Sequence, residues 1–114
     1  MKKRFFLCLL LLSISTACQT SDTRADEAAL RKLDEEWSRA IAAKDVEKTV
    51  SYYSDDAVVM LPNIPTLAGK EAIRGLWKTM LGSPSFGGGW RTIKVEVARS
   101  GELDYVSGDY EFTE

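Results

Sequence analysis

Between Trp37 and Trp77 the chain changes its hydrophobic pattern three times with almost no linker. Two amphipathic helical patterns are followed by a five-residue apolar run, residues 57–61, and then by a third helical pattern. Apolar residues at three- and four-residue spacing are typical of helices that bury one face, whereas a short continuous apolar run is typical of a strand covered on both faces. This order predicts a mixed fold in which helices pack on a sheet.

Three helices are expected. The first should run over residues 26–44, with an apolar side and a charged side. Asp45 should cap a short second helix. Pro62 and Pro65 break the chain after the apolar strand, and Gly69 opens the third helix. The expected inward-facing residues are Leu30, Leu33, Trp37, Ala40 and Ile41 in the first helix, Val46, Val50 and Tyr53 in the second, and Ile73, Leu76, Trp77 and Met80 in the third.

From Gly82 onward the period changes from helical to alternating. The glycine-rich stretch 82–89 predicts a connection without regular structure. Residues 93–97 alternate in polarity, which predicts a half-buried strand, and residues 100–102 predict a hairpin turn into a return strand. The return strand stops at Glu114 without a turn signal, which favours a chain truncated at its C-terminus. The expected inward-facing residues are Ile93, Val95 and Val97 on the first strand, and Val106, Gly108, Tyr110 and Phe112 on the second.

Residues 1–17 have the pattern of a signal peptide. A basic start is followed by an apolar run over residues 5–12 and by small residues before Cys18. That run is shorter than the ~20 residues that cross a bilayer. The segment before Cys18 resembles a bacterial lipobox, with Ser15 where leucine is usual, so we expect a lipid on Cys18 and an anchor and tether over residues 18–25. Ordinary cleavage that leaves a free N-terminal cysteine is the alternative.

The expected mature chain is acidic. The first 17 residues carry 3 of the 15 basic side chains and none of the 17 acidic ones, so their removal leaves 12 basic against 17 acidic groups and a net charge of −5. An acidic exported domain is a poor binder of nucleic acid. Together with the expected lipid anchor, this predicts a membrane-anchored protein of the cell envelope, on the periplasmic side if the source cell is Gram-negative, with no nucleic-acid partner.

Three short runs carry a family resemblance: residues 42–45 (Ala-Ala-Lys-Asp), 53–58 (Tyr-Ser-Asp-Asp-Ala-Val) and 69–73 (Gly-Lys-Glu-Ala-Ile). Together with the element order, they resemble the SnoaL-like branch of the nuclear transport factor two superfamily over residues 26–114. The resemblance implies an α+β fold of the cystatin-like type, a cone-shaped, curved antiparallel sheet packed on three N-terminal helices with a pocket at its mouth. It also implies two further strands after the point where this chain ends. Enzymes and plain binding modules share that fold, so the fold alone does not give the function.

Few residues are suited to catalysis. The chain contains no histidine, which excludes Ser-His-Asp triads, Cys-His pairs and histidine-built zinc sites. The resemblance to ketosteroid isomerases puts Leu61 and Trp37 where those enzymes keep an aspartate base and an oxyanion-binding tyrosine, and neither side chain can do that chemistry. Asp55 and Asp56 fit either a cation site or a turn, and we favour the turn. Asp109 is a weak catalytic candidate, expected on the strand face that looks away from the cone.

The expected pocket is apolar, and ordinary core packing of the same aromatic rings is the alternative. We expect an exported, lipid-anchored single domain that binds a small apolar ligand or forms a homodimer, with no cofactor or metal. Isomerase, cyclase or hydratase activity on a small hydrophobic molecule is the alternative function. The residues expected to line the pocket are Trp37, Tyr53, Leu61, Trp77, Tyr110 and Phe112.

Overall fold

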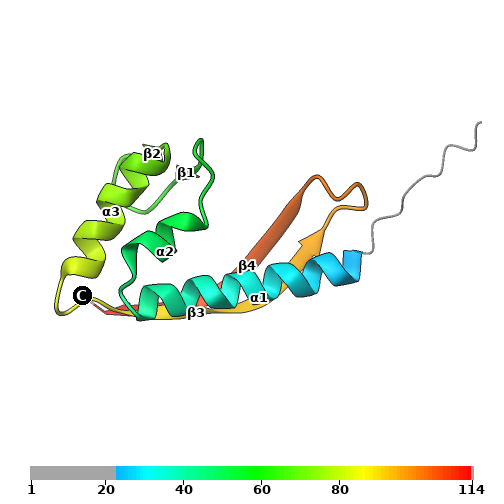
Figure 1. The fold of residues 1–114 in the computed structure, drawn as a ribbon, viewed down its shortest axis with the longest axis horizontal. Coiled ribbons are helices and arrows are strands. Elements are labelled where there is room, and N and C mark those ends of the chain that lie inside the picture. Colours follow the sequence, from blue (N-terminus) through cyan, green and yellow to red (C-terminus); the bar gives the residue numbers. More distant parts are fainter. Residues whose placement is uncertain (1–22, 114) are drawn as a thin grey trace, which may run out of the picture.

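The computed structural model describes residues 23–113, so the expected signal peptide and the lipidation site at Cys18 lie outside the described residues. Helix α1 lies along a long hairpin, and the two shorter helices sit near the end of the hairpin where α1 finishes (Figure 1). This arrangement confirms the predicted α+β class. The elements are α1 (Thr23–Ala42), α2 (Val46–Ser51), β1 (Val58–Val59), β2 (Leu67–Ala68), α3 (Lys70–Gly82), β3 (Gly87–Val97) and β4 (Asp104–Thr113).

The helices begin and end close to where the sequence predicts them. Helix α1 starts at Thr23 and ends at Ala42, slightly earlier at both ends than expected. The carboxylate of Asp45 accepts a hydrogen bond from the backbone N–H of Lys48 at 2.9 Å, which confirms it as the cap of α2. Gly69 precedes α3 with φ of 86°, a conformation that favours glycine. Within residues 23–113, no helix is both long and apolar enough to cross a bilayer.

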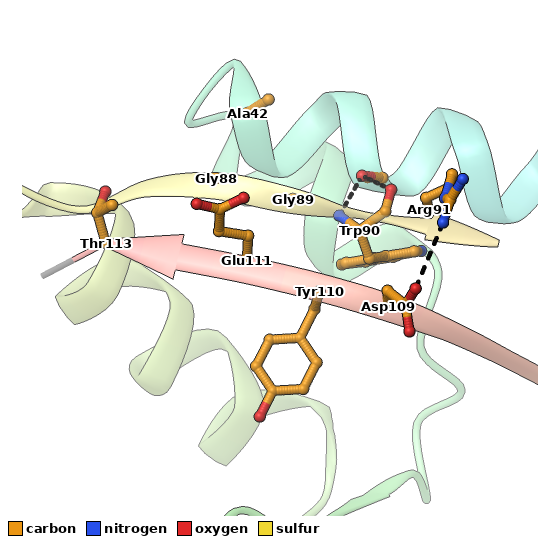
Figure 2. A pocket seen from close by; sticks show the side chains of 10 residues that line it. Ala42, Gly88, Gly89, Trp90, Arg91, Asp109, Tyr110, Glu111 and Thr113 are labelled. Atoms are coloured by element: carbon orange, nitrogen blue, oxygen red, sulfur yellow. Dashed lines mark hydrogen bonds and ion pairs between the residues drawn. The ribbon is translucent and has the colours of Figure 1, made fainter. Parts of the chain in front are cut away.

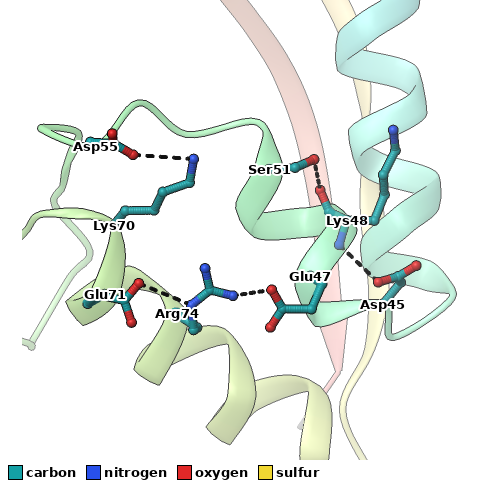
Figure 3. A network of polar contacts seen from close by, with 8 residues as sticks. All are labelled: Asp45, Glu47, Lys48, Ser51, Asp55, Lys70, Glu71 and Arg74. Carbon is teal, nitrogen blue, oxygen red and sulfur yellow. Dashed lines mark hydrogen bonds and ion pairs between the residues drawn. The ribbon is translucent and has the colours of Figure 1, made fainter.

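The hydrophobic core sits where α2 and α3 meet the C-terminal half of α1 and the start of β3. Its largest fully buried apolar side chains are Ile41 and Ile73, and Ile73 has no exposed surface. Across the surface of the same helices, Arg74 of α3 forms ion pairs with Glu47 of α2 and with Glu71, the latter at 3.4 Å (Figure 3). These exposed pairs contribute little, so burial holds the helices together. The buried core residues are Ile41, Val50, Ile73, Trp77, Leu81 and Phe86.

The apolar run 57–61 is not a strand covered on both faces, and that prediction is wrong. Only Val58 and Val59 form strand β1, and they pair with β2, a strand that the sequence did not predict. Val59 packs against the core, whereas Val58 is 56% exposed and Met60 is 78% exposed. Successive side chains of a strand point to opposite sides, and helices cover only one side of this short pair. Within this run, Val59, Met60 and Leu61 line the apolar rim of a cavity.

The glycine-rich connection predicted over residues 82–89 is also shorter than expected, because Gly87 already begins β3. Gly88 has φ of 123°, and a side chain there would collide with the backbone carbonyl oxygen of Glu111 on β4. Glycine is therefore needed for the close pairing of the two strands at this point. The run of three glycines belongs to the hairpin itself.

A β-bulge changes which residues of β3 face α1. The register between β3 and β4 shifts between Thr92 and Lys94, so Ile93 has no partner on β4. Ile93 is 53% exposed, which makes the prediction of an inward Ile93 wrong, whereas Thr92 and Val95 are buried. The predicted hairpin turn is confirmed in the loop before β4, where the N–H of Ala98 donates to the carbonyl of Leu103 at 2.8 Å.

Candidate ligand-binding site

A cavity of about 580 Å³ opens between α1, the β1 rim, α3 and the β3–β4 hairpin. Its volume is within the range of small-molecule sites, about 300–1,000 Å³. The structure brings together all six residues that were expected to line a pocket. Whether the cavity holds a ligand stays a prediction. The six residues are Trp37, Tyr53, Leu61, Trp77, Tyr110 and Phe112.

Trp37 is the centre of the aromatic wall of this cavity. Its ring is edge-on to Tyr53 at a centroid distance of 4.8 Å and edge-on to Trp90 at 5.2 Å, and it stacks on Tyr52 at 5.6 Å. These are favourable geometries for aromatic pairs. Ser38, the next residue of α1, holds the backbone of Trp90 against the helix. Its hydroxyl accepts a hydrogen bond from the backbone N–H of Trp90 and donates one to the Trp90 carbonyl, both at 2.8 Å. The three tryptophans of the chain, Trp37, Trp77 and Trp90, all line the cavity.

Two hydrogen-bond donors lie among the aromatic rings. The hydroxyl of Tyr53 accepts a hydrogen bond from the indole N–H of Trp77 at 3.1 Å. Burial raises the pKa of the Tyr53 phenol, and the bond from Trp77 lowers it by less, so the group stays neutral and able to donate. The indole N–H of Trp37 is buried and has no acceptor among the described residues. The hydroxyl of Tyr53 therefore offers a hydrogen-bond donor in the aromatic wall, whereas the indole N–H of Trp37 is covered by the surrounding protein.

Asp34 also lines the cavity, and sequence reasoning missed it. It is half-buried, and its carboxylate accepts a hydrogen bond from the hydroxyl of Thr92 at 2.5 Å. The signal that could have found it is spacing: Asp34 lies three residues before Trp37 and seven before Ile41, which places it on the apolar face of α1. The prediction gave that place to Leu33, which is instead 47% exposed.

Asp109, the weak catalytic candidate, does not line the apolar cavity. Its carboxylate lies 3.4 Å from the guanidinium of Arg91, and both side chains are more than two-thirds exposed. It borders a second hollow of about 720 Å³ beside Gly88 and Gly89, which shares Trp90 and Tyr110 with the apolar cavity. Figure 2 shows Tyr110 leaving β4 on the side opposite Glu111. Because alternate residues of a strand share a face, Asp109 lies on the side of Glu111, opposite the ring of Tyr110.

Asp55 has a structural contact in the described chain. Its carboxylate lies 3.6 Å from the ammonium group of Lys70, and its backbone carbonyl accepts from the N–H of the same residue at 3.1 Å (Figure 3). These contacts join the loop after α2 to the first turn of α3. Within residues 23–113, no three carboxylate or thiol side chains gather in a group that could hold a metal ion.

Comparison with known proteins gives a family and a fold. Residues 35–114 match the SnoaL-like domain family. An NTF2-like protein of unknown function from Pseudomonas putida KT2440 is 23% identical and superposes with a TM-score of 0.56 over 67% of this chain and 56% of its own. The chain thus spans just over half the length of that relative. No protein of curated function matches.

A second solved structure resembles the chain over most of both lengths. It is a ketosteroid isomerase-like protein from Erwinia carotovora atroseptica SCRI1043, 18% identical, with a TM-score of 0.61 over 76% of this chain and 75% of that one. At identities this low, the structural similarity to these two proteins establishes the fold and leaves the activity open. They confirm the predicted α+β cone fold.

Proposed function

This chain belongs to the SnoaL-like domain family, and from that premise we propose that its apolar cavity binds a small hydrophobic ligand. The observation that carries the proposal is the gathering of Trp37, Tyr53, Leu61 and Trp77, which come from four different segments, around one space of about 580 Å³. Residues of a closed core would leave no such space, because protein interiors pack as densely as crystals. The family hosts many activities, so the cavity and its side chains carry the argument.

Burial alone would give weak binding. A ligand that removes about 200 Å² of apolar surface from water gains about 5 kcal/mol, which corresponds to a dissociation constant on the order of 0.1 mM. The loss of translational and rotational freedom lowers this gain. Tight binding would therefore need a polar group of the cavity, such as the hydroxyl of Tyr53.

Ligand binding is preferred over steroid isomerisation because of two cavity residues. Leu61 and Trp37 both line the cavity, at the positions where the resemblance places a base and a phenol. Leucine has no proton acceptor, and an indole N–H can donate a hydrogen bond without exchanging a proton. Loss of an oxyanion donor typically costs ~10²–10³ in rate, and loss of a general base a further ~10²–10⁴. We expect a rate of steroid isomerisation equal to that without protein.

The neutral dye N-phenyl-1-naphthylamine tests the proposal, because its emission rises in apolar surroundings. We expect saturable binding, accompanied by a change in tryptophan emission, since all three tryptophans line the cavity. Leu61→Arg should abolish it by placing a charge at the rim. Val58→Arg is the matched control, since Val58 is 56% exposed and does not line the cavity. Equal loss in both variants, or no binding by a folded wild-type protein, would overturn the proposal.

We also propose that the domain is exported and held on the cell-envelope membrane through a lipid on Cys18. The support is the sequence pattern of residues 1–18, which lie outside the described residues. Cys18→Ala should move the protein from the membrane fraction to the soluble fraction, and mass spectrometry of the wild-type N-terminal peptide should find a diacylglycerol group. A variant that stays in the membrane fraction, together with an unmodified peptide, would contradict the anchor.

We also propose that the hairpin mediates homodimer formation. Leu103 and Tyr110 are each 72% exposed, and exposed apolar side chains favour contacts between proteins. Sedimentation equilibrium should then give twice the monomer mass, and Tyr110→Lys should lower it. A wild-type protein that sediments as a monomer at high concentration would exclude this arrangement.

A further inference from the structure

We propose that the cavity selects ligands that combine an apolar body with a positively charged amine, whose ammonium group docks on Asp34. This inference rests on the proposed function and adds to it the chemical class of the ligand. Asp34 is the acidic residue among the lining residues of the cavity, and its neighbours along the wall include Trp37 and Trp90. The apolar walls of the cavity suit an apolar ligand body, and the carboxylate suits a positively charged end group.

The carboxylate of Asp34 is fixed by a structural device in β3. The β-bulge at Ile93 turns Thr92 towards α1, where Thr92 is only 8% exposed. The Thr92 hydroxyl then donates to one carboxylate oxygen of Asp34 at 2.5 Å. Within the described part of the chain, the other carboxylate oxygen has no hydrogen-bond partner. One oxygen is thus held in place, and the second is available to a ligand.

Asp34 has no ion pair with the arginine that precedes it on α1, among the described residues. Arg31 lies one turn earlier on α1, but its guanidinium donates to the backbone carbonyls of Thr92, at 3.0 Å, and Ile93, at 3.3 Å. Among residues 23–113 no ion pair joins Arg31 to Asp34, and Arg31 does not line the cavity. The arginine ties α1 to the bulge and leaves the carboxylate with its charge.

The aromatic rings beside Asp34 favour the same ligand charge. Ring faces attract cations, with the largest effect for tryptophan, and this attraction grows when water is excluded. Trp37 and Trp90 both line the cavity, and their rings lie edge to face with each other. A ligand ammonium would interact with both the carboxylate and the rings, whereas a ligand carboxylate would be repelled by both.

Three ligands with the same eight-carbon chain separate this proposal from the proposed function. Octylamine, octanol and octanoate differ in the charge of one end group, and each can be titrated as a competitor of N-phenyl-1-naphthylamine. Apolar burial predicts that octanol displaces the dye. The charge of Asp34 predicts that octylamine binds about tenfold more tightly than octanol and that octanoate binds more weakly than both.

Asp34→Asn is the decisive variant, because its amide oxygen can still accept the hydrogen bond from Thr92 while the charge is removed. We expect it to lower the affinity for octylamine about tenfold and to leave that for octanol unchanged. Glu35→Gln is the matched control, since Glu35 is exposed on the same helix outside the cavity, and it should bind all three ligands as the wild type does. Thermal melts of both variants check that they are folded.

The outcomes are distinguishable. Equal affinities of the wild type for octylamine and octanol, or the same loss of octylamine binding in Asp34→Asn and Glu35→Gln, would overturn the charge proposal and leave apolar binding intact. Failure of all three ligands to displace the dye from a folded protein would instead count against the proposed function. Octanoate as the tightest ligand would contradict the role of Asp34 directly.

Discussion

The two ends of the molecule are built differently. At one end, α2, α3 and the C-terminal half of α1 surround a buried core that includes Ile41, Ile73 and Leu81. At the other end, the N-terminal half of α1 lies along the hairpin, where β4 has no fully buried residue. Polar contacts such as those of Arg31 and Thr92 join that end to α1. The cavity lies where the ends meet, so one wall is shaped by packing and the other by hydrogen bonds.

Two positions on α1 test this contrast most strongly. Ile41 is 1% exposed in the core, whereas Leu33, two turns earlier, is 47% exposed. Ile41→Ala should lower the free energy of unfolding by about 3 kcal/mol, because it removes buried methyl groups and leaves a cavity. Leu33→Ala should lower it by less than about 1 kcal/mol. Urea unfolding followed by tryptophan fluorescence measures both. Equal losses would mean that both halves of α1 are packed alike.

Glycine replacements are expected to have opposite signs in β3 and in α3. Gly88→Ala should destabilise by about 2 kcal/mol, because Gly88 has φ of 123° and a side chain would meet the backbone of β4. Gly75 lies inside α3 with open space around its Cα, so Gly75→Ala should stabilise by about 0.5–1 kcal/mol through helix propensity. Thermal melts of the two variants decide the matter. A tolerated Gly88→Ala would show that β3 and β4 do not pair closely there.

High pH should weaken the packed side of the cavity through Tyr53. Burial raises the pKa of this phenol above the usual 10.0, so the folded protein keeps a proton that the unfolded chain loses. Stability from this group is complete below pH 10 and falls as pH rises towards the folded pKa, by at most about 1.4 kcal/mol per pH unit.

Tyr53→Phe tests this effect, because it should unfold with a shallower dependence on alkaline pH than the wild type. Tyr110→Phe is the matched control, since Tyr110 is 72% exposed on the hairpin and its replacement should keep the wild-type slope. Urea midpoints measured between about pH 8 and 11 give the three slopes. A slope for Tyr53→Phe that equals the other two would contradict the burial of this phenol.

The smallest effect is expected at the outer face of the hairpin. Asp109 and Arg91 form an exposed ion pair, and such pairs contribute about 0–1 kcal/mol. Asp109→Asn should change the free energy of unfolding by less than about 0.5 kcal/mol, and dye binding should stay unchanged because the residue lies outside the cavity. Loss of dye binding in this variant would restore Asp109 as a functional residue.

The packed end could be predicted from the sequence, because helix periodicity and caps are local signals. Asp45, Ile73 and Trp77 all lie where the sequence predicts. The hairpin end could be predicted only in outline, because the bulge that exposes Ile93 depends on pairing with a distant strand. The pairing of the apolar run 57–61 is likewise not a local signal, because its partner β2 is brought back beside it by the intervening loop.

The candidate site followed the same division. Its six expected lining residues could be predicted, five from periodic faces of helices and strands and Leu61 from the apolar run 57–61. Asp34 was missed because a charged residue on α1 was read as surface, although its spacing from Trp37 places it on the apolar face. The Thr92 hydroxyl that holds its carboxylate is brought there by the bulge, which no local pattern indicates.

The central claim is that a small apolar ligand enters the space between the two ends. Nuclear Overhauser contacts between bound octylamine and the ring protons of the protein measure this directly. We expect contacts from the octyl chain to the indoles of Trp37 and Trp77 and none to Leu103, which is 72% exposed at the tip of the hairpin. Contacts to Leu103 without contacts to either indole, in a folded and saturated sample, would show that the ligand binds outside the cavity.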